Sequence, residues 1–205
     1  MTIGDTGEAS LSEIVRCPDC TSEPSRADLL KGVQRVVTWA DWQSSPALLE
    51  AEAAVKQLLE GERWCVFLRG EYGIGKTMLA QIAAWEWTAK KQPAVFVNVP
   101  DFLASLRETF DDDNRNTSRE TYASKFEAYA ESPFLVLDDL GAESRKEWTR
   151  EQVYRIIDRR YQRRSPTIVT SNSKFNDELD PRVLSRLTPG AVVIKGVGDQ
   201  RPLYE

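Results

Sequence analysis

Short apolar runs alternate with helical segments along most of the chain. Runs rich in aromatic and β-branched residues occur at 64–70, 94–99, 134–139, 167–172 and 191–195. Apolar residues recur at helical spacing in 47–60, 77–90, 101–110, 120–131, 144–164 and 181–187. Short, nearly uninterrupted apolar strands separated by helices are typical of a parallel sheet with both faces covered. The pattern predicts an α/β fold with a five-stranded parallel sheet.

The N-terminal segment has a different texture. Residues 1–31 lack sustained periodicity, carry six acids against three bases, and contain Cys-Pro-Asp-Cys at 17–20. Such a segment is typical of a loosely ordered appendage. We therefore expect an N-terminal arm over residues 1–35 that serves partner binding, followed by one folded domain over residues 36–205.

The loop after the first apolar run carries the strongest chemical signal. Residues 70–77 read Gly-Glu-Tyr-Gly-Ile-Gly-Lys-Thr, which fits the pattern G-x-x-x-x-G-K-[ST] between a strand and a helix. Glycines let successive N–H groups point inward, the following helix offers its positive end, and Lys76 supplies a charge for β/γ-phosphates. The Thr77 hydroxyl would bind Mg²⁺. The alternative is a glycine-rich turn without a ligand, which this setting disfavours.

Two later strands end in polar residues. One run ends in Asp138 and Asp139, and the next ends in Asn172. Ligands of open α/β sheets bind at the carboxyl ends of strands, so these side chains should emerge beside the glycine loop. Asp138 suits a Mg²⁺ contact, Asp139 suits orienting or deprotonating an attacking water, and Asn172 suits holding that water or touching a γ-phosphate. Taken alone, two acids after a strand more often form a turn or a helix cap, and Asn172 fits a helix cap or an Asx turn as well as a functional role.

The composition limits which other chemistry remains. The chain has 205 residues, 27 Lys+Arg against 32 Asp+Glu for a net charge of −5, and no histidine. The lack of imidazole excludes Ser-His-Asp and Cys-His nucleophiles and histidine-ligated zinc. The acidic balance disfavours tight, sequence-blind nucleic-acid binding by a monomer. No apolar stretch reaches the ~20 residues of a membrane span, and no signal peptide is evident, so we expect a cytoplasmic protein without membrane association.

Two features are open to more than one interpretation. Cys17 and Cys20 have metal-ligand spacing, yet a structural zinc site needs four ligands, so zinc shared between two subunits competes with a plain turn. The helix over 144–164, counted together with Glu143 just before it, has a local excess of four positive charges. Such a run is usually a solvated face with i,i+4 ion pairs, and its alternative is a DNA track or a subunit contact.

Together these residues resemble the AAA+ ATPases, and among them the DnaC/IstB-like family of helicase loaders and transposition helpers. The resemblance covers roughly residues 36–201 and implies a Walker A motif at 70–77, a Walker B motif at 134–139 and a sensor I residue at Asn172. It implies ATP or ADP held with Mg²⁺, the metal being bound by Thr77 and Asp138. The residues that would hold the nucleotide are Gly70, Gly73, Ile74, Gly75, Lys76, Thr77 and Met78. Residues 98–103 match the segment that leads into a helical element associated with single-stranded DNA contact.

Two arginine motifs extend the resemblance. Residues 180–187 are similar to the R-x-x-x-R box of the family, which implies that Arg186 is an arginine finger reaching the γ-phosphate of a neighbouring subunit in a homo-oligomer, with Arg182 as its companion. A guanidinium there would stabilise the charge that develops on the transferred phosphoryl group. The alternative places both arginines on a solvated face. Arg201 is similar to a sensor II arginine, and no separate C-terminal helical lid is expected.

The resemblance implies an ATP-dependent replicative helicase loader that engages a helicase and single-stranded DNA in an oligomer. The alternatives are an IstB-like transposition helper on duplex DNA, a P-loop nucleotide kinase, and a nucleotide-gated binding module without turnover. Asp139 stands where many AAA+ proteins have Glu. Because misplacement by ~1 Å costs ~100-fold in rate, we expect weak hydrolysis stimulated by assembly.

Overall fold

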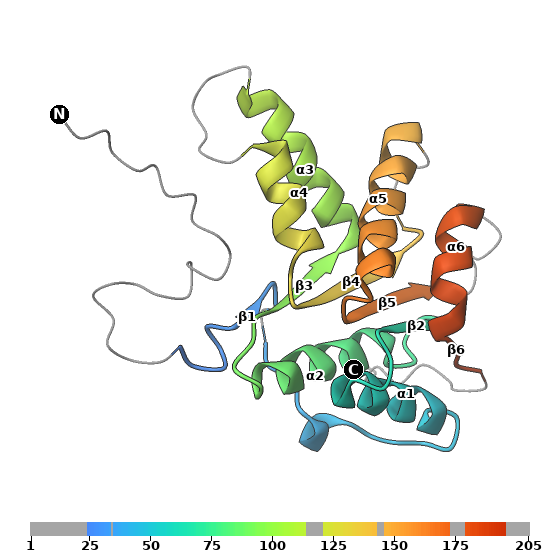
Figure 1. Cartoon of the computed structure of the whole chain (residues 1–205). Helices are drawn as coiled ribbons and strands as arrows, with labels where there is room; N and C mark the ends of the chain where they lie inside the picture. The colour runs from blue at the N-terminus through green and yellow to red at the C-terminus, as the bar shows by residue number, and fades with distance from the viewer. Residues whose placement is uncertain (1–23, 34, 114–120, 143–145, 173–178, 196–205) are drawn as a thin grey trace, which may run out of the picture.

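The structure is a computed structural model that describes residues 24–33, 35–113, 121–142, 146–172 and 179–195. Within these residues a parallel sheet lies between two layers of helices (Figure 1). The strands, in their order across the sheet, are β1 (Leu30–Lys31), β3 (Ala94–Asn98), β4 (Phe134–Leu140), β5 (Thr167–Asn172), β2 (Cys65–Gly70) and β6 (Ala191–Val193). The helices are α1 (Leu49–Glu60), α2 (Lys76–Thr88), α3 (Val99–Asp113), α4 (Tyr122–Ala130), α5 (Glu147–Arg163) and α6 (Pro181–Leu187), with 3-10 turns η1 (Trp39–Asp41) and η3 (Thr188–Gly190).

The sheet has one strand more than the sequence predicted. Each of the five predicted runs contains a strand, which confirms the α/β class, but β1 adds a sixth strand at the edge beside β3. The prediction of five strands is therefore wrong. A strand of two residues shows no period in the sequence, and Leu30 and Lys31 are recruited by tertiary pairing with Ala94 and Val95.

Part of the predicted arm is attached to the folded unit. The Arg26 guanidinium lies 4.2 Å from the ring centroid of Trp85 on α2 and donates to the Trp85 carbonyl oxygen at 2.7 Å. Gly32 has a φ of +82°, and a Cβ there would lie 1.8 Å from the carbonyl oxygen of Phe96. Glycine is required for so close an approach to β3. Residues 24–33 are therefore held against α2 and the sheet edge, while the arm–domain boundary at residue 35 stays a prediction.

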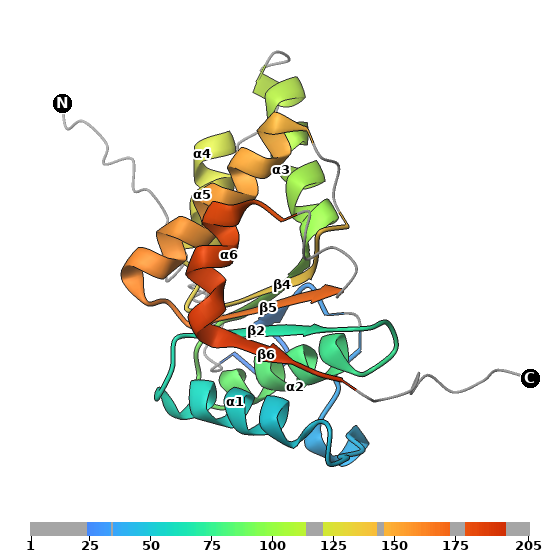
Figure 2. The same ribbon diagram turned by 90° about the vertical axis from the view of Figure 1, so that its right-hand side faces the viewer.

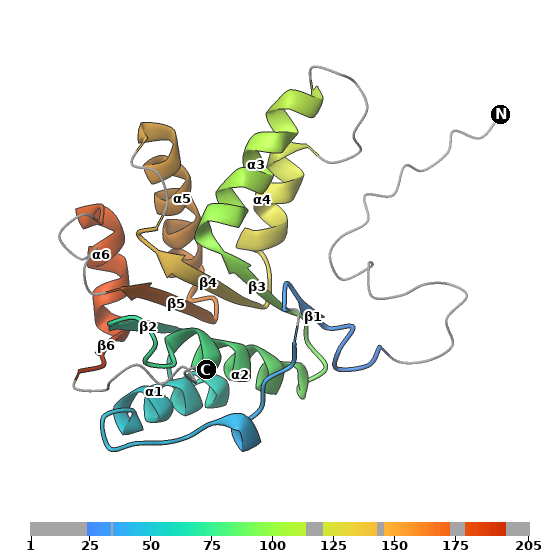
Figure 3. The same ribbon diagram turned by 180° about the vertical axis from the view of Figure 1, so that it is seen from behind.

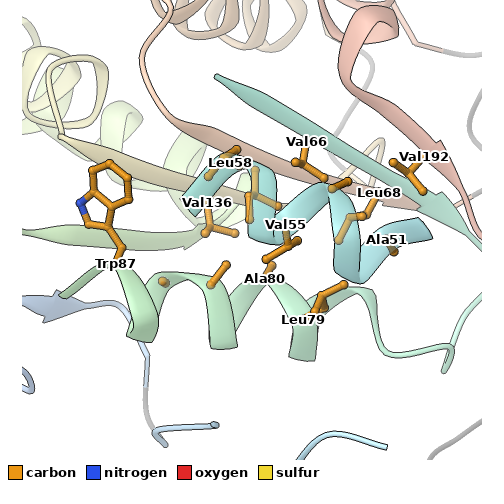
Figure 4. Packing of buried hydrophobic residues seen from close by; sticks show 14 of the residues in the cluster. Ala51, Val55, Leu58, Val66, Leu68, Leu79, Ala80, Trp87, Val136 and Val192 are labelled. Atoms are coloured by element: carbon orange, nitrogen blue, oxygen red, sulfur yellow. The ribbon is translucent and has the colours of Figure 1, made fainter. Parts of the chain in front are cut away.

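Helices α1 and α2 cover one face of the sheet (Figure 1). Helix α1 ends at Gly61, whose φ of +84° gives the left-handed C-cap that glycine adopts without strain. Figure 4 shows apolar side chains of both helices meeting those of the strands. The labelled members of this cluster are Ala51, Val55, Leu58, Val66, Leu68, Leu79, Ala80, Trp87, Val136 and Val192. This apolar layer fixes the first turn of α2 against the strands from which the site is built.

Helices α3, α4, α5 and α6 cover the opposite face (Figures 2 and 3). Their apolar sides form a second buried cluster with the strands, which includes Phe67, Phe102, Leu106, Phe126, Leu135, Leu137, Leu140, Ile156, Val169 and Val183. Coverage on both faces explains why the central strands are nearly continuous apolar runs. Within the part of the chain that the structure describes, no helix is both long and apolar enough to cross a membrane.

The side chain of Arg160 on α5 is completely buried. It donates to carbonyl oxygens at the end of α4 and before β5, and to one hydroxyl: Tyr129 O (3.2 Å), Ala130 O (2.9 Å), Ser132 O (2.9 Å), Pro166 O (2.7 Å) and Thr167 Oγ1 (2.7 Å). Burial lowers the pKa of Arg160 to about 9. The predicted solvated face applies to Arg159 and Arg163, which pair with Glu131, and not to Arg160.

Replacing Arg160 by alanine is expected to lower the free energy of unfolding by about 3–5 kcal/mol, because buried carbonyl oxygens lose their donors and a cavity remains. The matched control is Arg159→Ala, on the same helix, whose side chain is 40% exposed. That change should cost less than about 1 kcal/mol. Urea unfolding followed by circular dichroism measures both. Equal losses in the two variants would contradict a special structural role for Arg160.

Candidate functional site

A cavity of about 700 Å³ opens at the carboxyl ends of β2, β4 and β5. Most of the predicted site residues line it: Gly73, Ile74, Gly75, Lys76, Thr77, Met78, Asp138, Asp139 and Asn172. Gly70 lies at the end of β2, beneath the loop. The structure therefore brings together the glycine loop and both polar strand ends that the sequence singled out.

Glycines shape the loop for backbone reasons. A Cβ on Gly70 would lie 2.3 Å from Ile74 Cδ1 and 2.8 Å from the carbonyl oxygen of Ile194. Gly73 and Gly75 have φ values of +75° and +92°, in the left-handed region that glycine adopts freely. Gly75 is also the N-cap of α2, so the first backbone N–H groups of the helix face the cavity and favour an anion there.

Lys76 is buried, with 7% of its surface exposed. Its Nζ donates to the carbonyl oxygens of Gly70 at 2.9 Å and Glu71 at 2.6 Å, and to Asn172 Oδ1 at 3.0 Å. Burial lowers the pKa of Lys76, and the nearby carboxylates oppose that shift. The lysine charge is thus held at the loop by neutral oxygens, in reach of any phosphate that enters the cavity.

The β4 strand carries a bulge at its two acids. Leu137 pairs with Val169 and Leu140 with Ser171, so Asp138 and Asp139 together oppose the single residue Thr170 on β5. Leu135, Leu137 and Leu140 all lie in the same buried cluster, which regular alternation along a strand would not allow. Asp139 takes up the extra residue with a φ of +60°. Both carboxylates therefore line the cavity instead of facing opposite sides of the sheet.

Asp138 lies at the centre of a hydroxyl network. Its carboxylate accepts hydrogen bonds from Thr77 Oγ1 at 3.0 and 3.1 Å and from Thr170 Oγ1 at 2.7 Å. Burial raises the pKa of Asp138, and the two hydroxyl donors oppose that shift. A carboxylate beside a threonine hydroxyl supplies the hard oxygen ligands that suit Mg²⁺ completed by phosphate and water. The residues present fit the predicted metal.

Asn172 connects the lysine to the second acid. Its Nδ2 donates to Asp139 Oδ1 at 2.7 Å, while its Oδ1 accepts from Lys76. The alternative interpretation of Asn172 as an Asx turn does not describe these contacts. One amide therefore sets the separation between the lysine predicted to bind phosphate and the carboxylate predicted to act on water.

Sequence reasoning missed several residues of the cavity. Thr170 lines it and could have been found, because it lies two residues before Asn172 and shares that face of β5. Arg35, Val37 and Asp41 also line it. No local pattern marks these three, since they reach the cavity through the path of the chain from the edge strand β1 to α1.

Trp42 adds a further contact from that segment. A Cβ on Gly75 would lie 3.0 Å from the Trp42 ring, so the indole packs directly on the loop. The ring is fixed in turn, because Trp42 Nε1 donates to Glu52 Oε1 at 2.8 Å and Glu52 is buried. The segment before α1 thereby supports the loop from outside.

The predicted arginine finger lies away from this cavity. Arg186 is on α6, where its Nε donates to Asp158 Oδ1 at 2.5 Å and its Nη2 to the Tyr154 hydroxyl at 2.9 Å. Arg182 is half exposed and pairs with Asp180 at 2.8 Å. The solvated-face interpretation describes Arg182 better than Arg186, which is largely enclosed by α5. Neither lines the cavity of its own chain.

Three predicted residues fall outside the described part of the chain: Cys17, Cys20 and Arg201. The remaining cysteine, Cys65, is buried and free in β2, and burial raises the pKa of its thiol to about 12. Among the residues that the structure describes, no group of three or more cysteine or acidic side chains is arranged to hold a metal. The shared zinc site and the sensor II role stay predictions.

Residues 49–181, more than half of the chain, match the family of IstB-like ATP binding proteins. The chain belongs to this family. The match includes the glycine loop, both acids and Asn172, and it confirms the resemblance inferred from those motifs. It also confirms the predicted nucleotide-binding class for this IstB-like protein.

Curated relatives of the IstB-like chain carry two kinds of name. The replicative helicase loader DnaI of Bacillus subtilis is 32% identical over 108 residues, which is 52% of this chain and 32% of DnaI. The replicative helicase loader DnaC of Escherichia coli is 25% identical over 147 residues, covering 70% and 58%. The insertion sequence IS232 putative ATP-binding protein of Bacillus thuringiensis is 31% identical over 150 residues, covering 69% and 56%. The chain thus spans about a third of DnaI and less than two thirds of the other two.

Solved structures share the fold of the IstB-like chain. The crystal structure of the DnaC helicase loader matches with a TM-score of 0.66 and 23% identity, over 78% of this chain and 97% of that one. AMPPCP-bound DnaA from Aquifex aeolicus matches with a TM-score of 0.70 and 22% identity, over 83% and 53%. DnaA bound to AMPPCP and single-stranded DNA matches with a TM-score of 0.68 and 25% identity, over 80% and 51%. These likenesses confirm the predicted α/β fold of the AAA+ type.

Replacing Asp138 by asparagine is expected to raise the thermal midpoint of the ligand-free protein by about 2–4 °C, the shift that about 1 kcal/mol gives a chain of this size. The reason is the raised pKa of Asp138: the folded state favours the protonated carboxyl, so ionisation costs stability as pH rises through the folded-state pKa. The difference in thermal midpoint should disappear as the pH falls below 3.8, because the Asp138 carboxyl then becomes neutral in the folded and the unfolded state alike.

Differential scanning calorimetry measures the difference in thermal midpoint between Asp138→Asn and the wild type. The measurements run from about pH 3.5 to about pH 8, roughly the range over which a buried carboxyl titrates. The matched control is Asp101→Asn, because Asp101 is exposed at the start of α3. That variant should melt within about 1 °C of the wild type. A lower midpoint for Asp138→Asn at neutral pH would refute the assignment of a destabilising buried charge.

Proposed function

We propose that this IstB-like protein binds and slowly hydrolyses ATP with Mg²⁺ and acts as a replicative helicase loader. The observation that carries the proposal is the convergence of Lys76, Thr77, Asp138, Asp139 and Asn172 in one cavity, linked by hydrogen bonds. Support for the loader role comes from relatives with that name, DnaI and DnaC. DnaA bound to AMPPCP and single-stranded DNA has a similar fold, which supports both the nucleotide and the DNA expectation.

Each group in the cavity has a distinct task in this proposal. The loop amides and Lys76 bind the phosphates, and Thr77 with Asp138 holds the metal. When bound, Mg²⁺ would supply positive charge that offsets the charge of the phosphates. Asp139 orients and deprotonates the attacking water, and Asn172 keeps that carboxylate in place through its 2.7 Å hydrogen bond.

The rest of the cavity suits the base and sugar of a nucleotide. Arg35, Val37, Asp41 and Gln81 line it beyond the phosphate loop, so the wall combines apolar surface with hydrogen-bonding groups. We assign these residues to the nucleoside end of ATP. The segment before α1 therefore contributes to affinity as well as to support of the loop.

Slow turnover follows from the geometry of Asp139. The left-handed φ of +60° is tolerated by aspartate, whose short side chain bonds locally, better than by glutamate. A carboxylate one methylene shorter than glutamate lies further from the phosphates. Slow hydrolysis suits a timing function, because the loader then stays bound to ATP for longer than it needs to bind its partners.

Arg186 acts on a second copy in this proposal. Its guanidinium lies on α6, on the opposite face of the sheet from α2, and does not line its own cavity (Figure 2). Supplied to a neighbour, it would stabilise the transferred phosphoryl group. The proposed binding of single-stranded DNA also requires assembly, because the chain has a net charge of −5 and several copies are needed to align their local basic surfaces.

A second candidate function has one specific observation in its favour. The IS232 putative ATP-binding protein is 31% identical to this chain, a level close to that of DnaI. A transposition helper would engage duplex DNA and a transposase. The cavity chemistry is the same in both roles, so partner and DNA preference decide between them.

The first test compares ATP binding by the wild type and Lys76→Ala. Loss of the lysine charge should weaken ATP binding at least about 100-fold, since a charge-assisted contact to phosphate is worth about 3 kcal/mol. Isothermal titration calorimetry measures it. The matched control is Lys56→Ala, an exposed lysine on α1, which should bind ATP like the wild type. Wild-type affinity in Lys76→Ala would remove the basis of the proposal.

The same two variants then decide the role. ATP hydrolysis is measured alone, with single-stranded DNA, with duplex DNA, and with a hexameric replicative helicase from the source organism. The loader proposal expects stimulation by the helicase and single strands, absent in Lys76→Ala and kept in Lys56→Ala. Stimulation by duplex DNA instead would favour the transposition helper, and phosphate transfer to a nucleoside monophosphate would establish a kinase.

Arg186→Ala tests the contribution in trans. ATP affinity should stay within about threefold of the wild type, while assembly-stimulated hydrolysis falls at least about 100-fold, as for other arginine fingers. An equimolar mixture of Arg186→Ala and Lys76→Ala should recover activity, because each supplies what the other lacks. Thermal melting checks that loss of the Asp158 contact leaves the fold intact. Unchanged cooperative hydrolysis in Arg186→Ala would reject the assignment.

A further inference from the structure

Thr170 occupies the position opposite the bulge in β4. Between the pairs Leu137–Val169 and Leu140–Ser171, it is the single residue of β5 that faces two acids. It is buried, with 1% of its surface exposed. A bulge interrupts the regular backbone ladder at such a point, so other groups must satisfy the displaced N–H and hold the extra residue.

The Thr170 hydroxyl makes both bonds that the bulge requires. It accepts a hydrogen bond from the Asp139 N–H at 2.9 Å, and it donates to Asp138 Oδ1 at 2.7 Å. One side chain therefore ties the backbone of one acid to the carboxylate of the other. The neighbouring Ser171 closes the bulge by donating to the Leu140 carbonyl oxygen at 2.6 Å.

The consequences reach both functional carboxylates. The hydrogen bond from the Asp139 N–H to Thr170 holds Asp139 at a φ of +60°. In this conformation the Asp139 carboxylate accepts a hydrogen bond from the Asn172 amide. With its Oδ1 bound to Thr170, Asp138 is held where the Thr77 hydroxyl also reaches it. The hydroxyl touches the acids and not the loop or the lysine, so its effect should fall on catalysis more than on nucleotide affinity.

We propose that Thr170 is a positioning residue of this site, whose hydroxyl locks the β4 bulge so that Asp138 and Asp139 face the phosphate loop together. The inference rests on the proposed ATP hydrolysis for its kinetic consequence. Its structural part, the lock on the bulge, concerns the ligand-free chain and stands independently. A valine of the same shape fills the space of Thr170 and makes neither hydrogen bond.

The test compares Thr170→Val with Thr170→Ser in the full chain. In the ligand-free protein, amide hydrogen exchange at Asp139, followed by nuclear magnetic resonance, should be at least about tenfold faster in the valine variant. The serine variant keeps the hydroxyl and should exchange like the wild type. Thr109→Val controls for loss of a buried hydroxyl elsewhere, because Thr109 is 3% exposed on α3 and bonds within its own helix.

The kinetic arm uses the same three variants at saturating ATP and Mg²⁺. We expect kcat to fall about 10–100-fold in Thr170→Val, the loss that misplacement by ~1 Å produces, with KM for ATP changed less than about threefold. Thr170→Ser should restore most of the rate, and Thr109→Val should behave like the wild type. Affinity for ATP without Mg²⁺ should be the same in all.

Several outcomes would overturn the inference. Equal Asp139 exchange and equal kcat in the valine and serine variants would show that the hydroxyl does not position the acids. A parallel loss of ATP affinity without Mg²⁺ would show that Thr170 maintains the whole loop instead. If the valine variant does not fold, Thr170→Ala replaces it in both arms. A wild type that hydrolyses no ATP would reject the proposed function, while Asp139 exchange would still decide the structural lock.

Discussion

Strand β5 pairs in parallel with both β2 and β4, and this double pairing determines where every part of the site lies. Parallel strands present their carboxyl ends at one edge of a sheet, so the loop after β2 and the acids of β4 meet on either side of β5. Along β5 itself, Ile168 lies in the apolar cluster under α1 and α2, and Thr170 and Asn172 follow on the same face at steps of two residues. One face of β5 therefore carries a core residue at Ile168 and site residues at Thr170 and Asn172, so the geometry of the site depends directly on the packing of the core.

The sequence predicted the parts of this arrangement that follow from periodicity and from the directions of strands. Apolar runs predicted the central strands. Because parallel strands end at a common edge of the sheet, the sequence also predicted that Lys76, Asp138, Asp139 and Asn172 lie together. The glycine pattern of the loop succeeded for a related reason. The clash with Ile74 that a side chain on Gly70 would meet and the left-handed backbone of Gly73 are requirements within the loop, so they are visible in the residue types.

The features that escaped prediction depend on contacts distant in sequence. The edge strand β1 is two residues long and exists through its pairing with β3. The burial of Arg160 depends on carbonyl groups at the end of α4 and just before β5, so the arginine-rich helix gave no sign of which guanidinium turns inward. The bulge at Asp139 required knowledge of the register against β5. Local composition predicts the chemistry of a site, whereas tertiary register determines the orientation of each side chain.

The ligand-free site holds charges in an environment that disfavours them. Burial lowers the pKa of Lys76 and raises that of Asp138, so desolvation moves each group toward its neutral form. The neutral partners around them, two backbone carbonyls with Asn172 for the lysine and two threonine hydroxyls for the carboxylate, satisfy hydrogen bonds without cancelling charge. A phosphate beside Lys76 and a cation beside Asp138 would supply that compensation. The burial that disfavours these two charges would therefore favour a ligand that carries both opposite charges, as a nucleotide with its metal does.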